Sequence, residues 1–206
     1  MDPMDDPMDL QALDALVLLG QQFTRVIGFV GRAGAGKDTA ADVIKSMYPA
    51  GVTTMAFAQP LKDICSQAFL LDPLAYADRR MKETVDPRWG MSPRQMAQRL
   101  GTDFFRELDP DFWVKRARFA LEDKIGGTVI FTDVRFLNEA EFVSEELGGM
   151  LVYLDADRRL NLECSDRLHA SEREVYEIRR LCDAVVENNG DLLEFRNKIE
   201  MAAWSY

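Results

Sequence analysis

The apolar residues of this chain fall into five short runs, separated by longer stretches with helical spacing. The runs cover residues 24–30, 52–57, 128–132, 150–154 and 184–187. They are mostly continuous in apolar character and rich in Val and Ile, which is typical of parallel strands that are buried on both faces. The pattern therefore predicts five β-strands at the centre of an α/β fold.

Between these strands, apolar residues recur at the three- and four-residue spacing of amphipathic helices. Residues 92–95 (Ser-Pro-Arg-Gln) and 171–174 (Ser-Glu-Arg-Glu) are capping-box sequences, which mark helix starts. The alternation of strand and helix predicts a parallel sheet with helices on both faces, a three-layer sandwich. The expected helices span residues 37–47, 61–71, 92–100, 109–124, 138–147, 171–181 and the end of the chain to about 204.

Three stretches fit neither pattern. Residues 72–90 are polar without clear periodicity, and residues 156–170 form a charged loop. Residues 1–9 are rich in Met, Asp and Pro and are expected to be disordered or loosely attached, whereas residues 10–19 have helical spacing. That helix would pack on the domain or form a dimer contact. We expect residues 1–22 to be an extension of a domain that spans residues 23–206.

The segment between the first strand and the first helix has the spacing of a phosphate-binding loop. It reads Gly31-Arg32-Ala33-Gly34-Ala35-Gly36-Lys37-Asp38-Thr39. Its glycines would let successive backbone N–H groups face phosphate oxygens, and the helix would add the positive end of its dipole. The ammonium of Lys37 would reach the β- and γ-phosphates. The segment predicts a nucleoside triphosphate site, the alternative being a glycine-rich turn without a ligand.

One position of this loop departs from the usual pattern. The residue after the lysine is commonly Ser or Thr, whose hydroxyl holds magnesium, and here it is Asp38, followed by Thr39. A carboxylate is a hard oxygen ligand that would hold Mg²⁺ directly or through water. Small nucleotide kinases tolerate this change and switch GTPases generally do not, so a regulatory GTPase is disfavoured.

Several polar residues follow the predicted strands, at the sheet edge where ligands bind in such folds. Asp133 follows the third strand and would serve magnesium as a Walker B aspartate does, or else be a solvated loop residue. Arg135 would contact a phosphate through its planar guanidinium. Asn188 follows the fifth strand. We therefore expect Asp38 and Asp133 to be metal ligands, beside ATP bound at residues 31–39 and Asn188.

Composition excludes some classes of protein. The 206 residues include 25 Lys and Arg against 35 Asp and Glu, a net charge of −10, which disfavours coating of nucleic acid or of an anionic membrane. The three cysteines have no metal-binding spacing and are expected to be reduced thiols. The beginning of the chain has neither a basic region nor a long apolar run, so a cytoplasmic location is expected.

Basic residues are nevertheless concentrated in two intervals. The interval between the second and third strands contains candidates for binding the phosphate of an acceptor: Arg79, Arg80, Arg94 and Arg106. Its aromatic residues would offer a stacking face for a base, or would simply be core residues: Phe104, Phe105, Trp89 and Trp113. After the fourth strand, Arg158, Arg159 and Arg167 lie where small kinases keep a mobile lid over the transferring phosphoryl group. His169 is expected to be structural.

The chain resembles the bacteriophage-type deoxynucleoside monophosphate kinases from about residue 25 to residue 189. The resemblance is carried by the phosphate loop and by four further stretches. These are residues 59–63 (Gln-Pro-Leu-Lys-Asp), 92–94 (Ser-Pro-Arg), 101–106 (Gly-Thr-Asp-Phe-Phe-Arg) with Phe112-Trp113, and 133–139 (Asp-Val-Arg-Phe-Leu-Asn-Glu).

The resemblance implies a P-loop kinase fold with strand order 2-3-1-4-5, an acceptor-binding insert at residues 58–126 and a lid at residues 155–171. It implies transfer of the γ-phosphoryl of ATP to a deoxynucleoside monophosphate with Mg²⁺ for DNA precursor synthesis, often by a homodimer. The implied catalytic residues are Lys37, Asp38, Asp133, Arg135, Arg158 and Arg167. The implied substrate-binding residues are Lys62, Arg79, Arg94, Gln98, Asp103, Phe104, Arg106, Trp113 and Glu139.

Two other functions are compatible with these motifs. A phosphomevalonate kinase of the animal type also has Gly-Lys-Asp in its phosphate loop and a phosphate monoester as acceptor. A non-catalytic nucleotide-binding module would need only the loop, but this chain has no Asn-Lys-x-Asp element for guanine, and the arginines of the lid would have no function. The aromatic residues near Phe104 favour an acceptor that carries a base.

Replacement of Lys37 by alanine should abolish most turnover while leaving the fold intact, because we expect this side chain to point at the β- and γ-phosphates and not into the core. Steady-state rates with ATP and a panel of acceptors measure the effect. A variant with near-normal rates would contradict the assignment of this loop.

Overall fold

The computed structural model describes residues 23–48, 51–122, 124, 126–160 and 170–204. The chain divides into two compact units: residues 57–119 form the second, and the described residues before and after them form the first. The second unit falls within the interval predicted as an insert, residues 58–126, apart from its first residue. The helix expected at residues 10–19 lies outside the described residues.

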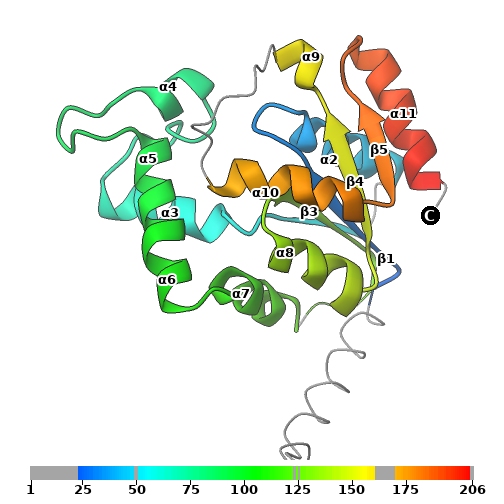
Figure 1. Ribbon diagram of the computed structural model, residues 1–206, viewed down its shortest axis with the longest axis horizontal. Helices are drawn as coiled ribbons and strands as arrows, with labels where there is room; N and C mark the ends of the chain where they lie inside the picture. The colour runs from blue at the N-terminus through cyan, green and yellow to red at the C-terminus, as the bar shows by residue number, and fades with distance from the viewer. Residues whose placement is uncertain (1–22, 49–50, 123, 125, 161–169, 205–206) are drawn as a thin grey trace, which may run out of the picture. The chain divides into compact units, whose positions relative to one another are not determined.

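The first unit is built on a parallel sheet of five strands, shown in Figure 1. The strands are β1 (Arg25–Val30), β2 (Val52–Met55), β3 (Thr128–Val134), β4 (Met150–Asp155) and β5 (Ala184–Glu187). Their order is β2-β3-β1-β4-β5, as predicted. β3 continues to Val134, so Asp133 belongs to the end of the strand rather than to the loop that follows it.

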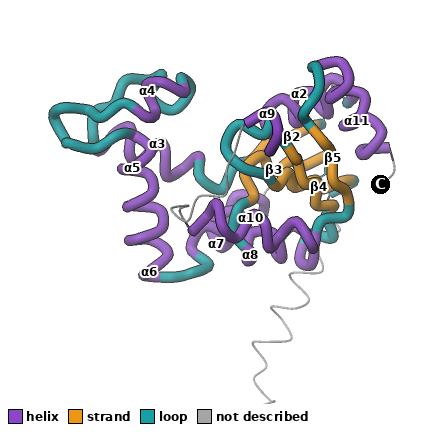
Figure 2. Tube along the Cα trace, turned by 45° about the horizontal axis from the view of Figure 1, so that its top comes forward, coloured by secondary structure: helices purple, strands orange, loops and turns teal. Residues whose placement is uncertain are grey.

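Two helices cover one face of this sheet, as Figures 1 and 2 show: α2 (Lys37–Met47) and α11 (Leu192–Trp204). Their apolar side chains form one buried cluster with the strands, in which Ile44 and Phe195 meet Phe29 and Val152. The apolar residues that predicted an amphipathic helix at residues 37–47 thus lie on the buried face of α2. Removal of this apolar surface from water is the main favourable term in folding the unit.

The other face is covered by α8 (Leu137–Glu141), the π-helix η2 (Phe142–Glu146) and α10 (Ala170–Ile178) (Figure 1). Phe142 packs edge-to-face on Phe131 of β3, with ring centroids 6.0 Å apart. Gly28 of β1 makes room for this layer, because a Cβ there would lie 2.9 Å from Leu151 and 3.0 Å from Val143. The unit is therefore the three-layer sandwich that the sequence predicts.

The second unit is helical. It contains α3 (Gln59–Ala68), α4 (Arg79–Glu83), α5 (Pro93–Gln98), the π-helix η1 (Arg99–Phe105), α6 (Arg106–Leu108) and most of α7 (Phe112–Leu121). The capping box at Ser92 is present: its hydroxyl accepts from the Gln95 N–H, and the Gln95 side chain accepts from the Ser92 N–H. α4 was not expected, because five residues are too few to show periodicity; its start is capped by Asp78.

Several predicted helix boundaries differ from the structure. The helix from residue 93 does not end near Leu100 but continues as η1 and α6 to Leu108. The helix expected at residues 61–71 spans Gln59–Ala68, and the one expected at residues 109–124 spans Phe112–Leu121. α10 spans Ala170–Ile178, which includes Ser171. Two further short helices, α9 (Asp157–Leu160) and the 3₁₀-helix η3 (Arg179–Leu181), complete the first unit.

Gly101 should be intolerant of substitution, because a Cβ there would lie 2.4 Å from Cδ2 of Leu61 in α3. We expect Gly101→Ala to lower the free energy of unfolding by about 1–3 kcal/mol through overpacking. Denaturant unfolding of this variant in the wild-type and Leu61→Ala backgrounds measures the effect. The cost should shrink in the Leu61→Ala background, and an equal cost in both would contradict the proposed contact.

Candidate active site

The loop from Gly31 to Gly36 has a backbone conformation that requires glycine. Gly34 and Gly36 have φ angles of 82° and 98°, in the left-handed region that L-residues rarely adopt. A Cβ at Gly31 would lie 2.9 Å from the carbonyl oxygen of Leu154 in β4. The three glycines therefore allow a tight loop to pass from β1 into α2 against the neighbouring strand.

The ammonium of Lys37 lies inside this loop. Its Nζ donates to the carbonyl oxygens of Gly31 and of Arg32, the latter at 2.8 Å, and the residue is only 7% exposed. Lys37 is also the first residue of α2, where the backbone N–H groups and the helix dipole favour an anion. The positive charge and the helix terminus are thus at the same end of the loop, as a phosphate site needs. The contacts also show that Lys37→Ala would loosen the loop, so its thermal stability should be measured with its rate.

β3 contains a bulge beside Asp133. Gly28 pairs with Phe131 and Val30 with Val134, so β3 has one more residue than β1 between these pairs. Such an extra residue re-aims the side chains at the end of a strand and is frequent beside active sites. Asp133 is half-buried and directly precedes the partner of Val30, the last residue before the loop.

The oxygen ligands at this edge fit magnesium better than a transition metal. Asp38 and Thr39 are exposed in the first turn of α2, and Asp133 lies at the end of β3. Among the described residues no group of three or more His, Cys, Asp or Glu side chains is arranged to hold a metal. Mg²⁺ in kinases is commonly held by one or two carboxylates together with substrate phosphates. Asp38 and Asp133 are carboxylates of the kind that would hold Mg²⁺, and their assignment as metal ligands stays a prediction.

Glu139 binds the backbone of the turn after β3. Its Oε2 accepts from the backbone N–H groups of Arg135 and Phe136, at 2.9 and 3.2 Å, and the residue is 3% exposed. The carboxylate therefore holds the turn between β3 and α8, which carries Arg135. The prediction that Glu139 also binds substrate stays a prediction.

A tyrosine that the sequence did not indicate contacts the phosphate loop. Arg32, 8% exposed, donates from NH1 to the hydroxyl of Tyr176 in α10 at 2.9 Å. Arg179, the residue after the end of α10, forms an ion pair of 3.1 Å with Asp155 and lies over the ring of Tyr153. Arg32 and Tyr176 are 144 positions apart, and no sequence pattern links them, so only the fold shows that they are partners.

The lid residues are described only in part. Arg158 is exposed on α9, which begins two residues after β4. Arg167 and His169 lie outside the described residues, so the predicted lid function of residues 155–171 stays a prediction.

In the second unit, the predicted acceptor residues differ in their surroundings. Arg94 forms an ion pair of 2.6 Å with Glu83, and Arg106 donates to the Pro110 carbonyl at 3.0 Å. Both arginines therefore have partners within the unit. The other polar candidates are exposed or half-buried on its helices: Lys62 on α3, Arg79 on α4, Gln98 on α5 and Asp103 on η1.

The aromatic candidates differ in their exposure. Trp113 is 4% exposed, and its Nε1 donates to the Gly101 carbonyl at 3.2 Å. Its ring packs against Phe105 and Phe112, so it belongs to the core of the unit. Phe104 is 51% exposed and packs edge-to-face on Phe105. Trp89, another stacking candidate, is 41% exposed, so the exposed rings among the candidates are those of Phe104 and Trp89.

The two described cysteines are unreactive thiols. Burial raises the pKa of Cys65, which is fully enclosed, and raises the pKa of Cys182 to about 12. Both side chains are thus neutral at physiological pH and are not nucleophiles.

A parallel sheet of this order, with a phosphate loop between its first strand and helix, defines a P-loop kinase fold. A family model described as deoxynucleotide monophosphate kinase matches residues 75–199. A protein of Acanthamoeba polyphaga mimivirus with the name "Putative deoxynucleotide monophosphate kinase" is 37% identical over 188 residues, 84% of this chain and 93% of the relative. The chain belongs to the deoxynucleotide monophosphate kinase family and is a nucleotide kinase.

Solved structures of other kinases are similar to this chain at low sequence identity. Shikimate kinase from Aquifex aeolicus is 13% identical, with a TM-score of 0.48, over 87% of this chain and 96% of its own. Dephospho-CoA kinase from Campylobacter jejuni is 12% identical, with a TM-score of 0.42, over 88% and 96%. Within the described residues, no helix has the length and apolar character to cross a membrane.

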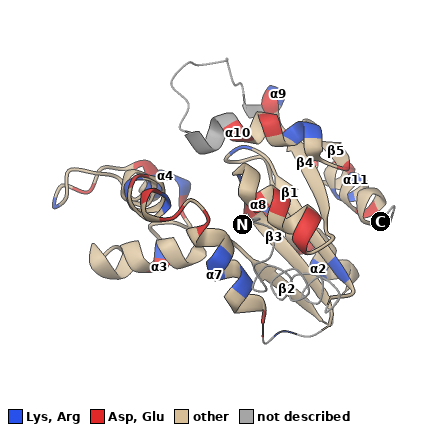
Figure 3. Ribbon diagram, turned by 60° about the horizontal axis from the view of Figure 1, so that its bottom comes forward, with Lys and Arg blue, Asp and Glu red and all other residues tan. Residues whose placement is uncertain are grey.

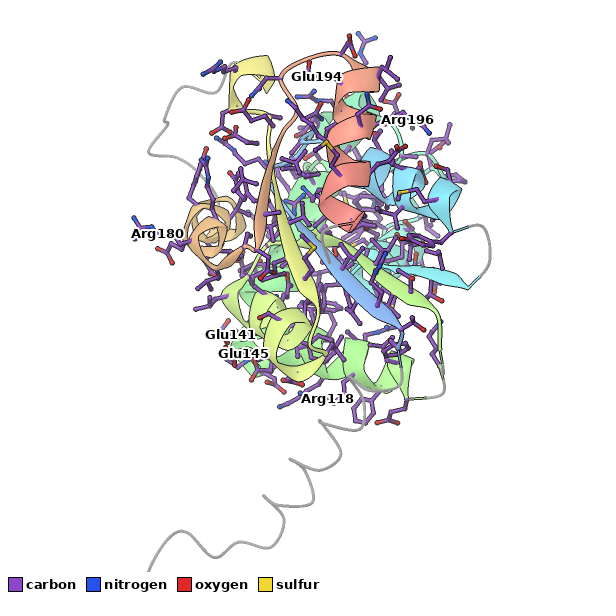
Figure 4. The ribbon with its side chains drawn as sticks, turned by 90° about the vertical axis from the view of Figure 1, so that its right-hand side faces the viewer. Arg118, Glu141, Glu145, Arg180, Glu194 and Arg196 are labelled. Carbon is purple, nitrogen blue, oxygen red and sulfur yellow. The ribbon has the colours of Figure 1, made fainter. Side chains whose placement is uncertain are left out.

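Glu139→Ala should destabilise the protein by about 1–3 kcal/mol, because it leaves two backbone N–H groups without their buried acceptor. The matched control is Glu141→Ala, since Glu141 is exposed on the same helix α8 (Figure 4) and should be nearly neutral. Urea unfolding measures both. If Glu139→Ala kept wild-type stability and only raised KM for the acceptor, Glu139 would be a substrate ligand after all.

Proposed function

We propose that this protein transfers the γ-phosphoryl group of ATP to the 5′-phosphate of a deoxynucleoside monophosphate. An acceptor phosphate oxygen bonds to the γ-phosphorus, the bond from that phosphorus to the β,γ-bridging oxygen breaks, and ADP leaves. The products are a deoxynucleoside diphosphate and ADP. The observation that carries the proposal is the phosphate loop with the Lys37 ammonium held inside it, in a chain of the deoxynucleotide monophosphate kinase family.

The residues of the first unit would handle the triphosphate. The loop N–H groups and the start of α2 would bind its phosphates, and Lys37 would shift from the loop carbonyls toward the β- and γ-oxygens. Asp38 and Asp133 would hold Mg²⁺, which supplies positive charge to the β- and γ-phosphates when bound. Arg135, on the turn held by Glu139, would contact the transferring group through its guanidinium. Arg158 and Arg167 would close over the phosphates and exclude water.

The residues of the second unit would bind the acceptor. An acceptor phosphate carries nearly two negative charges and is best bound by arginine, for which Arg79, Arg94 and Arg106 are the candidates. Figure 3 shows basic residues on α4 among acidic ones. Arg94 would have to exchange Glu83 for the phosphate, a more highly charged partner. The exposed ring of Phe104 would stack on the base. The polar residues Lys62, Gln98 and Asp103 complete the proposed set.

The same proposal includes a role in DNA precursor synthesis, a cytoplasmic location and assembly as a homodimer, which rest on the resemblance to the bacteriophage enzymes. Family membership favours a nucleotide acceptor over phosphomevalonate, and favours an enzyme over a binding module.

An acceptor panel tests the proposal. Purified protein with MgATP should form diphosphates from one or more of dAMP, dGMP, dCMP, dTMP and hydroxymethylated pyrimidine monophosphates. It should be slower with the ribose counterparts and inactive with phosphomevalonate. Chromatography of the products identifies each diphosphate. Turnover with phosphomevalonate alone would show that the protein is a phosphomevalonate kinase. ATP binding without any product would indicate a binding module.

A further inference from the structure

Asn188 is fixed between two strands and the phosphate loop. It directly follows β5, and its backbone N–H donates at 2.7 Å to the carbonyl of Asp155, the last residue of β4. The residue is 9% exposed. The sheet therefore fixes the position of Asn188 at the edge where the phosphate loop begins.

The side-chain amide of Asn188 contacts the loop at the peptide between Ala35 and Gly36. Its Nδ2 donates to the carbonyl oxygen of Ala35 at 2.8 Å. A carbonyl oxygen can only accept, so the nitrogen and not the oxygen of the amide must face it. Gly36 makes this approach possible, because a Cβ there would lie 2.5 Å from Nδ2 and 3.4 Å from the ring of Phe195.

The contact orients an N–H group of the loop. The carbonyl of Ala35 and the N–H of Gly36 belong to one trans peptide, in which they point in opposite directions. A carbonyl held toward Asn188 therefore turns the Gly36 N–H away from β5. Gly36 is also the N-cap of α2, whose terminus is the proposed phosphate site.

We infer that Asn188 is a positioning residue that orients the Gly36 N–H toward the bound phosphates by holding the Ala35 carbonyl. The inference rests on the proposed function only in that the loop binds a triphosphate. It replaces the expectation that Asn188 contacts ATP itself, because its amide nitrogen is engaged by the loop. The contribution of Asn188 to ligand affinity should thus depend on the phosphates of the ligand and not on its base.

Titration calorimetry of the full chain with MgATP and with magnesium inorganic tripolyphosphate tests this inference. Asn188→Ala removes the donor, and Asn188→Leu removes it while keeping the branched shape and the number of heavy atoms of the side chain. For both variants we expect Kd to rise about tenfold for ATP and by the same factor for tripolyphosphate. The matched control is Asn189→Ala, the same substitution one residue later, which should leave both Kd values unchanged. Thermal unfolding identifies the temperature at which each variant is folded.

Three outcomes would overturn the inference. A loss of affinity for ATP but not for tripolyphosphate would show that Asn188 contacts the nucleoside. A lower melting temperature with unchanged Kd values would show a purely structural residue. Failure of the wild-type protein to bind either ligand would overturn the loop assignment itself. Failure of the acceptor panel alone would leave the inference intact, because no acceptor is present in this titration.

Discussion

The structure of the site depends on keeping the backbone of one short loop in a conformation that few residues can adopt. The chain must turn from β1 into α2 while its N–H groups remain available for an anion. Glycines permit the turn, but they also leave the loop with many alternative conformations in the unfolded chain. Side chains supply the missing restraint: Lys37 binds two loop carbonyls, and Asn188 binds a third.

These restraints come from parts of the first unit that are remote in sequence. Asn188 stands at the end of β5, 153 positions from its partner Ala35, and Tyr176 of α10 holds Arg32. The sheet order explains the arrangement, because β1 lies between β3 and β4 and so the loop is flanked by strand ends on both sides. A change in β5 or α10 can therefore alter phosphate binding without touching a nucleotide.

A polar side chain also restrains the backbone after β3. The bulge in β3 lies beside Asp133, and Glu139 holds the following turn by accepting two backbone N–H groups. A buried carboxylate is stable only with such partners. These hydrogen bonds restrain the turn that carries Arg135, which the proposed contact with a transferring phosphoryl group would require.

The sequence by itself determined the strands, their alternation with helices and the phosphate loop, because each rests on a local pattern of apolar residues or glycines. It did not determine which charged or aromatic side chain is a ligand. Trp113 and Phe104 are both aromatic residues of the same stretch, yet one is buried and the other exposed. Glu139 and Asn188 are polar residues near a strand end, yet both bind backbone. Only tertiary packing decides these cases, since a side chain's function depends on the partners that folding brings to it.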